Sequence, residues 1–435
     1  MLLIYTHKVT PRLTYIFKHI FVRILQVPIL FTTKVEEFVA HKGMKMTYSK
    51  LPLGNEFFVR SHDLLFDQGI NDVEISMQTW EEDVPCFFNA GTKSSIPYDI
   101  FAASFYLLSR YEEYLPHVRD ALNCFPVEES LAFQHDFLEK PLVDVWAYKL
   151  RAQLQLQFPD FEFVSRSYSC QSVFSICQTY AYKYKGVLRT FGGFLSDLFS
   201  LRLQTFWDRI LVLVNFKKDP YDTYDQILRF KEEYDMDTML FFLISNYTTY
   251  DNNISITNNK FRLLIKSMSD YVRVGLNASF YTMDNVALLK KEVQKMEAIL
   301  NTPLSRTRQH LLRLHLPETY QHLIDLEVAE DHSMGYSEVF GFRASTCTPF
   351  YFYDLDYEIQ TPLKVIPFAV SDTVFQSKGL SPKQALLKVT ALNKEVRAVD
   401  GNFVTSFQNE LLSGYGKWKD WKGFYQSVLK QVYSS

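Results

Sequence analysis

The sequence contains little cysteine, glycine or proline. Its 435 residues include five Cys, 15 Gly and 16 Pro. The cysteines are scattered and none belongs to a C-x-x-C pair, which argues against a disulfide framework and against a structural zinc site built on thiolates. Reduced, mostly buried thiols are typical of a cytoplasmic protein, and we predict that location. The small share of Gly and Pro predicts few long flexible loops.

Neither sign of charge is in excess. The 46 Lys and Arg against 49 Asp and Glu leave a net charge of −3. Non-specific nucleic-acid binding needs a broad positive charge, so this balance predicts no nucleic-acid partner. The sequence also lacks both common phosphate-binding fingerprints, G-x-G-x-x-G and G-x-x-x-x-G-K-[ST], and so gives no support for nucleotide binding.

A long hydrophobic run is missing as well. Residues 13–31 are rich in Ile, Phe and Leu, but Lys18, His19 and Arg23 interrupt them. No run approaches the roughly 20 apolar residues that a membrane span requires, so we expect no span. The apolar residues of this segment fall on one helical face, with Thr10 as the N-cap. We predict an amphipathic helix packed on its own domain, and a helix lying on a membrane surface is the alternative.

The residues that are plentiful are aromatic, with 37 Phe and 27 Tyr available to fill a large core. At about 150 residues per domain, the length predicts two or three domains. Residues 1–165 mix short strands and helices, and we place the boundary just after Phe158-Pro159-Asp160. Within this first domain a helix is predicted over residues 100–114. Its charged end, Arg110, Glu112 and Glu113, is interpreted as a solvated surface with local charge pairs.

Residues 166–435 have a more regular pattern. Short apolar runs alternate with segments of helical spacing, and the runs lie at residues 173–177, 210–216, 239–245, 272–277, 341–344, 365–370 and 403–407. Strands that alternate with helices indicate βαβ units and a parallel sheet. Seven such units in this length favour a β/α barrel, with an open doubly wound sheet as the alternative.

The carboxyl ends of the predicted strands, where such barrels carry their reactive groups, have few acidic or imidazole side chains. The first strand ends near Ser175 and Cys177, the fourth at Asn277 and the last at Gln408. Ser, Cys, Asn and Gln are poor substitutes for the carboxylates and imidazoles of a hydrolytic metal site. The polar groups that remain near strand ends are Arg308, His310, Asp331, His332, Arg343 and Asp372.

Several stretches resemble a known family. Residues 180–186, 188–193, 308–310, 331–336, 341–350 and 415–421 resemble the polysaccharide deacetylase (NodB-homology, carbohydrate esterase type) domain of bacteria of the Bacteroidetes kind. Residues 96–114 resemble the uncharacterised domain that precedes it in that family. The resemblance implies a distorted (β/α)7 barrel over residues 166–435, preceded by a smaller α/β domain over residues 1–165. It also implies metal-dependent removal of acetyl groups from a carbohydrate.

The family's catalytic residues can be carried over position by position. Its acidic pair, a general base and a metal ligand, falls on Ser175 and Cys177, its metal-binding His on Asn277, and its last-strand His on Gln408. Arg343 remains in the motif whose Arg orients the base. Each replacement removes a group needed for the same reaction. The resemblance therefore predicts a degenerate deacetylase that needs no cofactor and acts in sugar binding or as a scaffold.

The alternative is an active metal-dependent deacetylase, with zinc as its cofactor, that uses the remaining groups His310, Asp331 and His332. Arg308 with His310 is a candidate pair for binding an anionic or sugar ligand. Cys177 has no His near it in sequence, so we do not predict it as a replacement nucleophile. A carbohydrate or sugar-linked ligand is the partner that these residues suggest, and no protein partner is predicted.

Overall fold

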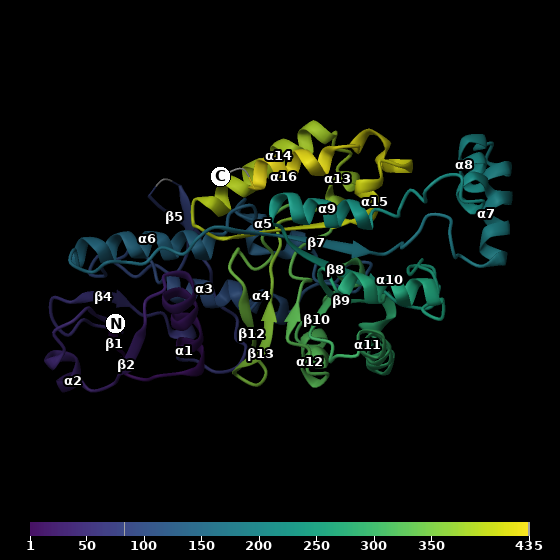
Figure 1. The fold of residues 1–435 in the computed structure, drawn as a ribbon. Helices are drawn as coiled ribbons and strands as arrows, with labels where there is room; N and C mark the ends of the chain where they lie inside the picture. The colour runs from purple at the N-terminus through teal and green to yellow at the C-terminus, as the bar shows by residue number, and fades with distance from the viewer. Residues whose placement is uncertain (82, 434–435) are drawn as a thin grey trace.

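The computed structural model describes residues 1–81 and 83–433. Its first strands form a small parallel sheet in the order β2-β1-β3-β4, which lies at one end of the molecule (Figure 1). The strands are β1 (Leu2–Tyr5), β2 (Ile29–Thr32), β3 (Lys45–Ser49) and β4 (Phe57–Arg60). Around them lie a short hairpin, β5 (Gln78–Trp80) and β6 (Val84–Cys86), and the α-helices α2 (Val35–Ala40), α3 (Ile100–Leu108), α4 (Tyr111–Tyr114), α5 (Leu131–Gln134) and α6 (Leu142–Gln157).

The apolar N-terminal segment is the predicted amphipathic helix. It begins as α1 (Pro11–Phe17) and continues as a π-helical stretch, η1 (Lys18–Ile24). The Thr10 hydroxyl accepts a hydrogen bond from the Leu13 amide at 3.1 Å, which caps the helix as expected. Phe17 stacks on Phe101 of α3, with ring centroids 4.0 Å apart. The apolar face of this helix is therefore buried in its own domain.

The second part of the chain forms a nine-stranded sheet in the order β12-β13-β11-β10-β9-β8-β7-β15-β14. Neighbouring strands run parallel except β12 and β13, which form an antiparallel pair. The strands are β7 (Ser169–Ile176), β8 (Asp237–Leu243), β9 (Arg273–Ala278), β10 (Arg306–Gln309), β11 (Glu330–Asp331), β12 (Phe350–Asp354), β13 (Ile359–Val365), β14 (Val370–Ser371) and β15 (Asn402–Gln408).

Among the described residues the sheet is not closed by strand pairing, so a regular seven-stranded barrel is not formed. A gap remains between β11 and β14, and residues 366–369 cross it. The Ile366 amide donates to the Asp331 carbonyl at 2.9 Å, and the Phe368 amide donates to the Met334 carbonyl at 3.2 Å. The chain must travel from β13 to β14 within these few residues, which leaves no length for a full strand. Side chains from both sides of the gap still share one buried cluster: Val173, Met239, Phe241, Leu312, Ile366, Phe368 and Val404.

Helices follow most of the parallel strands, as predicted. They are α9 (Tyr224–Tyr234), α10 (Asn259–Ser269), α11 (Val286–Leu300), α12 (Glu318–Asp325), α13 (Asp372–Ser377), α14 (Pro382–Arg397), α15 (Asn409–Ser413) and α16 (Phe424–Tyr433). Two further helices, α7 (Val187–Phe199) and α8 (Leu203–Leu213), stand apart from the body on two long connections (Figure 1).

The predicted strands over residues 210–216 and 341–344 are wrong, because residues 210–213 are the last turn of α8 and residues 341–344 lie in the turns between β11 and β12. The apolar residues Leu203, Trp207 and Leu211 recur every fourth position, which is helical spacing. A short apolar run at the end of such a stripe has the same composition as a buried strand, and the run alone does not distinguish the two.

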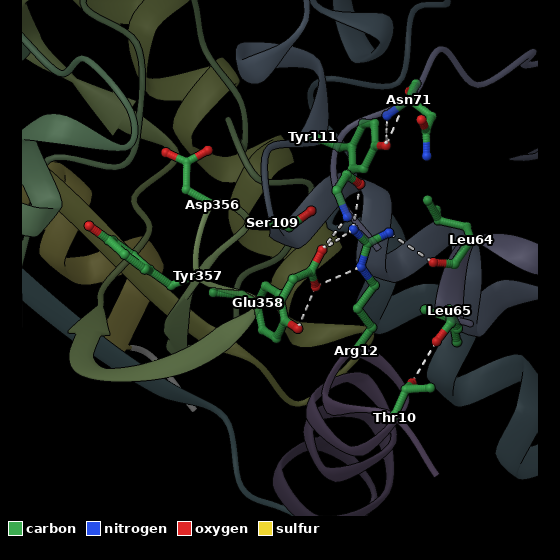
Figure 2. A network of polar contacts seen from close by, with 12 residues as sticks. Thr10, Arg12, Leu64, Leu65, Asn71, Ser109, Tyr111, Asp356, Tyr357 and Glu358 are labelled. Atoms are coloured by element: carbon green, nitrogen blue, oxygen red, sulfur yellow. Dashed lines mark hydrogen bonds and ion pairs between the residues drawn. The ribbon is translucent and has the colours of Figure 1, made fainter. Parts of the chain in front are cut away.

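A buried arginine ties the first helix to the hairpin between β12 and β13 (Figure 2). The Arg12 Nε donates to Glu358 Oε2 at 2.9 Å, and Arg12 Nη1 donates to the Leu64 carbonyl at 3.0 Å. The Tyr353 hydroxyl donates to the same Glu358 oxygen at 3.0 Å. The division at residue 165 stays a prediction, and these contacts join the two parts on either side of it.

The predicted solvated helix end at Arg110 is wrong. Arg110, Glu112 and Glu113 are all buried, and Glu113 accepts hydrogen bonds from Arg110 Nε at 2.8 Å and from both Arg343 Nε and Nη2 at 2.9 and 2.7 Å. Burial opposes ionisation of Glu113, but the two guanidinium groups outweigh it and lower its pKa to about 2. The charged run is interior because its partner, Arg343, comes from a segment 230 residues away in the chain.

Candidate functional site

A cavity of about 300 Å³ lies where the parallel strands end. It is lined by residues at or just beyond the carboxyl ends of β7, β9, β10, β14 and β15, among them Ser175, Cys177, Asn277, Arg308, Gln309, His310, Ser371, Asp372, Ser406 and Gln408. The carboxyl ends of parallel strands are the usual place for ligand sites in sheets of this kind. We call this cavity the strand-end pocket.

The strand register brings together the four positions to which the sequence resemblance assigned catalytic roles. Ser175 on β7 pairs with Gln408 on β15, and Asn277 on β9 pairs with Arg308 on β10. Cys177 follows directly after β7, and all of these side chains line the strand-end pocket. Sequence reasoning thus predicted a set of residues that the fold gathers in one place.

Cys177 lies between two polar side chains in this pocket. Its Sγ is 3.6 Å from His310 Nδ1, and Asn277 Nδ2 donates to Cys177 Sγ at 3.4 Å. His310 Nε2 is 3.2 Å from the Tyr250 carbonyl oxygen, which accepts only, so Nε2 carries the ring proton. Nδ1 is then the acceptor for the Cys177 thiol. Burial lowers the pKa of His310, so the neutral ring is favoured.

This cysteine–histidine contact was missed from the sequence, because 133 residues separate the two side chains. The available signal was that both follow strands whose carboxyl ends share one edge of the sheet. The contact resembles a nucleophile and base, with Asp251 Oδ1 3.9 Å from His310 Nε2. Burial, with Glu410 and Asp372 adding negative charge, raises the pKa of Cys177 to about 12, which keeps it a neutral and weakly nucleophilic thiol.

Arg308 supplies a positive charge to the strand-end pocket. Burial lowers the pKa of Arg308 to about 10, which still leaves it charged at neutral pH. One of its nitrogens donates to the His332 carbonyl, and its guanidinium lies 4.7 Å from the centroid of the Phe368 ring. In the described part of the chain, no carboxylate lies within ion-pair distance of Arg308.

Asp372 is the acidic side chain deepest in the pocket. It is the first residue of α13, and its Oδ2 accepts a hydrogen bond from the backbone N–H of Gln408 at 2.9 Å. Burial raises the pKa of Asp372 to about 7, so the carboxyl group changes charge close to neutral pH. The pocket therefore combines one permanent cation with one acid that titrates near neutrality.

Two buried amide groups of the pocket have unused hydrogen-bonding capacity. Asn277 Oδ1 and Gln309 Nε2 have no hydrogen-bond partner in the described chain. One is an acceptor and the other a donor, and buried polar atoms of this kind are normally satisfied by protein, water or ligand. Ser175, Ser371, Ser406 and Gln408 add further neutral donors and acceptors around them.

Three predicted site residues lie outside the pocket. Arg343 is held by Glu113, as described above. Asp331 accepts hydrogen bonds from the Tyr320 hydroxyl at 3.0 Å and the Ser333 amide at 2.8 Å, which makes it a support for the loop after β11. His332 packs its ring 4.9 Å from that of Phe241, and burial lowers the pKa of His332 to about 4. Of the predicted ligand-binding candidates, the fold brings Arg308 and His310 to the pocket.

The pocket does not suit a zinc ion. Over residues 1–81 and 83–433, no group of three or more His, Cys, Asp or Glu side chains is arranged to hold a metal. The groups at the positions that the resemblance assigns to the metal ligands and the base are the Ser175 hydroxyl, the Asn277 amide and a Cys177 thiol that stays protonated. Zinc prefers thiolate, imidazole and carboxylate ligands, so this donor set does not fit it.

Comparison with models of known families finds a match in the first part of the chain. Residues 2–159 match the model of DUF7033, a family of unknown function. No curated protein matches the chain.

Among solved structures, the chain is similar to a protein from Mycobacterium smegmatis assigned as a polysaccharide deacetylase, with a TM-score of 0.38 and 14% identity over 60% of this chain and 85% of that one. It is also similar to a CE4 family pseudoenzyme from Bacillus anthracis, with a TM-score of 0.32 and 10% identity over 62% of this chain and 63% of that one. Similarity to the allantoinase Puue has a TM-score of 0.37 and 9% identity over 59% of this chain and 83% of that one.

Proposed function

We propose that the strand-end pocket binds an anionic carbohydrate and does not carry out metal-dependent deacetylation. The observation that carries this proposal is the composition of the pocket. Neutral side chains occupy the positions where the chemistry of a deacetylase needs carboxylates and imidazoles. Among them lies the buried Arg308 guanidinium, which has no carboxylate partner among residues 1–81 and 83–433.

A sugar matches the neutral part of the lining. Its hydroxyl groups are donors and acceptors in fixed directions, as are the Ser175 and Ser406 hydroxyls and the Asn277, Gln309 and Gln408 amides. A pocket built to hydrogen-bond such groups loses affinity when they are absent, because its buried polar atoms are then unpaired. The unused Asn277 Oδ1 and Gln309 Nε2 are the atoms for which this matters most.

The charged part of the lining selects the kind of sugar. A guanidinium binds a carboxylate through two parallel hydrogen bonds, and a low-dielectric setting strengthens both. Arg308 lines the pocket and donates to one backbone carbonyl, and we expect its remaining N–H groups to be available to a ligand. A uronic acid, which carries a ring carboxylate, supplies the missing anion.

The alternative remains an active metal-dependent deacetylase that uses the surviving groups. His310 faces the pocket, but its Nε2 is committed to the Tyr250 carbonyl. Asp331 and His332 make their contacts elsewhere. Zinc would then have to bind with few of the ligands it prefers, and for this reason we favour the binding function.

Isothermal titration with glucuronate and with glucose tests the proposal. We expect glucuronate to bind more tightly than glucose, and Arg308→Gln to remove this preference. A hydrogen bond to a charged group contributes about 1.5–3 kcal/mol, which corresponds to roughly a tenfold to hundredfold loss of affinity. Arg306→Gln is the matched control, because Arg306 lies on the same strand and pairs with Glu330 at 3.0 Å outside the pocket. Equal binding of both sugars, unchanged in Arg308→Gln, would contradict the proposal.

A further inference from the structure

Helices α7 and α8 form a hairpin that projects from the body of the molecule (Figure 1). We call residues 187–214 the projecting hairpin. Its two helices pack on each other through Phe194 and Phe206, whose ring centroids lie 5.3 Å apart. Arg209 Nη2 reaches across to Asp197 Oδ2 at 2.7 Å. The hairpin is thus a formed unit with its own internal contacts.

Each helix of the projecting hairpin exposes an apolar stripe. On α7 the stripe includes Leu188 (88% exposed), Phe191 (62%) and Leu195, and on α8 it includes Leu203, Trp207 (60%) and Leu211. The residues of each stripe recur at three- or four-residue spacing. Phe199 and Leu201, at the turn between the helices, are also exposed. Apolar surface of this extent, rimmed by polar residues, indicates an interaction site.

Basic residues outnumber acidic ones in the hairpin and the segments that flank it. Residues 187–214 contain three Arg and two Asp, and the flanking residues 183–186 and 215–218 add four Lys, a net charge of 7 − 2 = +5 over residues 183–218 in a chain whose total is −3. Both acids are internally paired: Asp197 with Arg202 and Arg209, and Asp208 with Lys217 at 2.6 Å. The cations are Lys183, Lys185, Arg189, Arg202, Arg209, Lys217 and Lys218. Two of them also have partners outside this segment: Lys218 pairs with Asp225 at 2.7 Å, and Arg189 Nη1 donates to the Asn253 carbonyl at 2.7 Å.

We propose that the projecting hairpin docks on an anionic lipid bilayer, with its apolar stripes among the acyl chains and its cations at the headgroups. Exposed Phe, Trp and Leu beside Lys and Arg form the composition of helices that lie in the membrane interface. The 13 residues of α7 span roughly 20 Å, less than the ~30 Å hydrocarbon core, so the hairpin lies in the interface. No helix in the described part of the chain has the length and hydropathy to cross a bilayer.

Docking in this way orients the rest of the molecule. The projecting hairpin is inserted just after β7, at the strand end that carries Cys177 and the strand-end pocket. The pocket end therefore turns toward the headgroups when the hairpin is bound. The docking argument uses residues of the hairpin and the lysines that flank it, and it does not rest on the proposed sugar binding.

Vesicle flotation of the full chain tests the proposal. We expect the chain to float with phosphatidylcholine vesicles that contain phosphatidylglycerol and to remain in the bottom fraction with vesicles of pure phosphatidylcholine. Salt should release the bound chain from the anionic vesicles, because it screens charge attraction. Tryptophan emission supplies a second readout. Among the five tryptophans, all described, Trp207 is exposed and the other four are buried, so a blue shift on vesicle addition reports Trp207 entering an apolar setting.

The double change Phe191→Ser and Trp207→Ser should lower binding to the anionic vesicles at least about tenfold, because it removes the two large aromatic side chains of the stripes. Lys183→Glu with Lys218→Glu should lower it as well. Leu387→Ser on α14 is the matched control, since Leu387 is similarly exposed at 64% but lies away from the hairpin, and its binding should be unchanged. Far-ultraviolet circular dichroism checks that each variant is folded.

Two results would overturn the proposal. The first is an absence of binding to anionic vesicles by the folded parent chain. The second is sedimentation that shows self-association of the chain, lost in the Phe191→Ser and Trp207→Ser variant, together with equal flotation of both proteins. That result would assign the stripes to a second copy of the chain. A failure of the chain to bind glucuronate would leave the vesicle result unaffected. The proposals of sugar binding and of membrane docking can therefore be refuted independently.

Discussion

Asp372 controls the charge of the strand-end pocket. Burial raises its pKa to about 7, whereas Arg308 stays positive. Below this pH Asp372 is neutral and leaves the Arg308 charge unopposed by it, and above it the Asp372 carboxylate offsets that charge and repels an anion. Glu338, an exposed residue of the lining, is a second acidic group of the pocket. The neighbouring Glu410 also has a raised pKa because of its burial, and neutral His310 contributes no charge.

We predict that glucuronate binds more weakly as the pH rises through about 7. Titration calorimetry one pH unit on either side of this value measures the change. Asp372→Asn removes the titrating group and should leave affinity nearly flat with pH. If glucuronate binding by Asp372→Asn kept the full pH dependence, the dependence would have to come from another titrating group.

His19 is a polar side chain without polar partners. It is fully buried in η1, and neither ring nitrogen has a hydrogen-bond partner in the described chain. Burial lowers the pKa of His19 from 6.5 to about 3. The unfolded chain therefore takes up a proton at a higher pH than the folded chain does. Stability falls as the pH drops below about 6.5, where the unfolded state begins to bind that proton.

His19→Leu should stabilise the protein and reduce this loss in acid. Removing an unsatisfied buried polar group is worth about 1–3 kcal/mol, and the gain should be larger at mildly acidic pH than at neutral pH. Urea unfolding at two pH values measures it. If His19→Leu had a lower free energy of unfolding than the parent at both pH values, the imidazole would have to make a stabilising contact.

At the scale of elements, a buried ion cluster joins α4 to the loop after β11. Glu113 accepts hydrogen bonds from Arg343 and Arg110 in the interior. The two guanidinium groups, acting against burial, lower the pKa of Glu113 from 4.5 to about 2. Its contribution to stability is therefore complete above about 4.5 and is lost as the pH falls toward 2.

Glu113→Gln should destabilise the protein by about 3–5 kcal/mol at neutral pH, because it leaves two buried guanidinium groups without their shared carboxylate. The same change at the exposed Glu128 should have little effect and serves as the control. Chemical unfolding compares the two. Equal stability of both variants would show that the cluster is not a significant link between these elements.

The elements also show what sequence pattern predicts and where it stops. The Thr10 cap and the alternation of strands and helices followed from local spacing, and both are present. The run at residues 210–216 was assigned to a strand because a short apolar run has no period of its own. The burial of Arg110 and Glu113 depended on Arg343, a distant residue that no local pattern reveals.

The same limit applied to the candidate site. A family resemblance predicted Ser175, Cys177, Asn277 and Gln408 as corresponding positions, and the strand register brings them into one cavity. The contact of Cys177 with His310 required the register of strands far apart in the chain, so it appeared only in the structure. The lack of closure of the sheet likewise depended on the short path from β13 to β14.

At the scale of the whole molecule, the backbone should still direct side chains of the replaced positions to one point. We predict that Ser175→Asp, Cys177→Asp, Asn277→His and Gln408→His together create a zinc-binding site. Two new carboxylates repel each other without metal and lower stability, and bound zinc recovers it by linkage. Zinc should therefore raise the melting temperature of this variant and leave that of the parent unchanged. A variant with Asn277→Gln in place of Asn277→His is the control, and an equal zinc response in both would contradict the assigned register.

The most direct test of the central claim uses one ligand that offers both chemistries. A hyaluronan tetrasaccharide carries uronic acid carboxylates and N-acetyl groups, and proton nuclear magnetic resonance in the presence of zinc follows binding by saturation transfer and deacetylation by free acetate. We predict saturation transfer to the sugar with the parent chain, its loss with Arg308→Gln, its retention with Arg306→Gln, and no acetate above the protein-free control. Release of acetate by the parent chain, or saturation transfer that is the same in Arg308→Gln, would contradict the account.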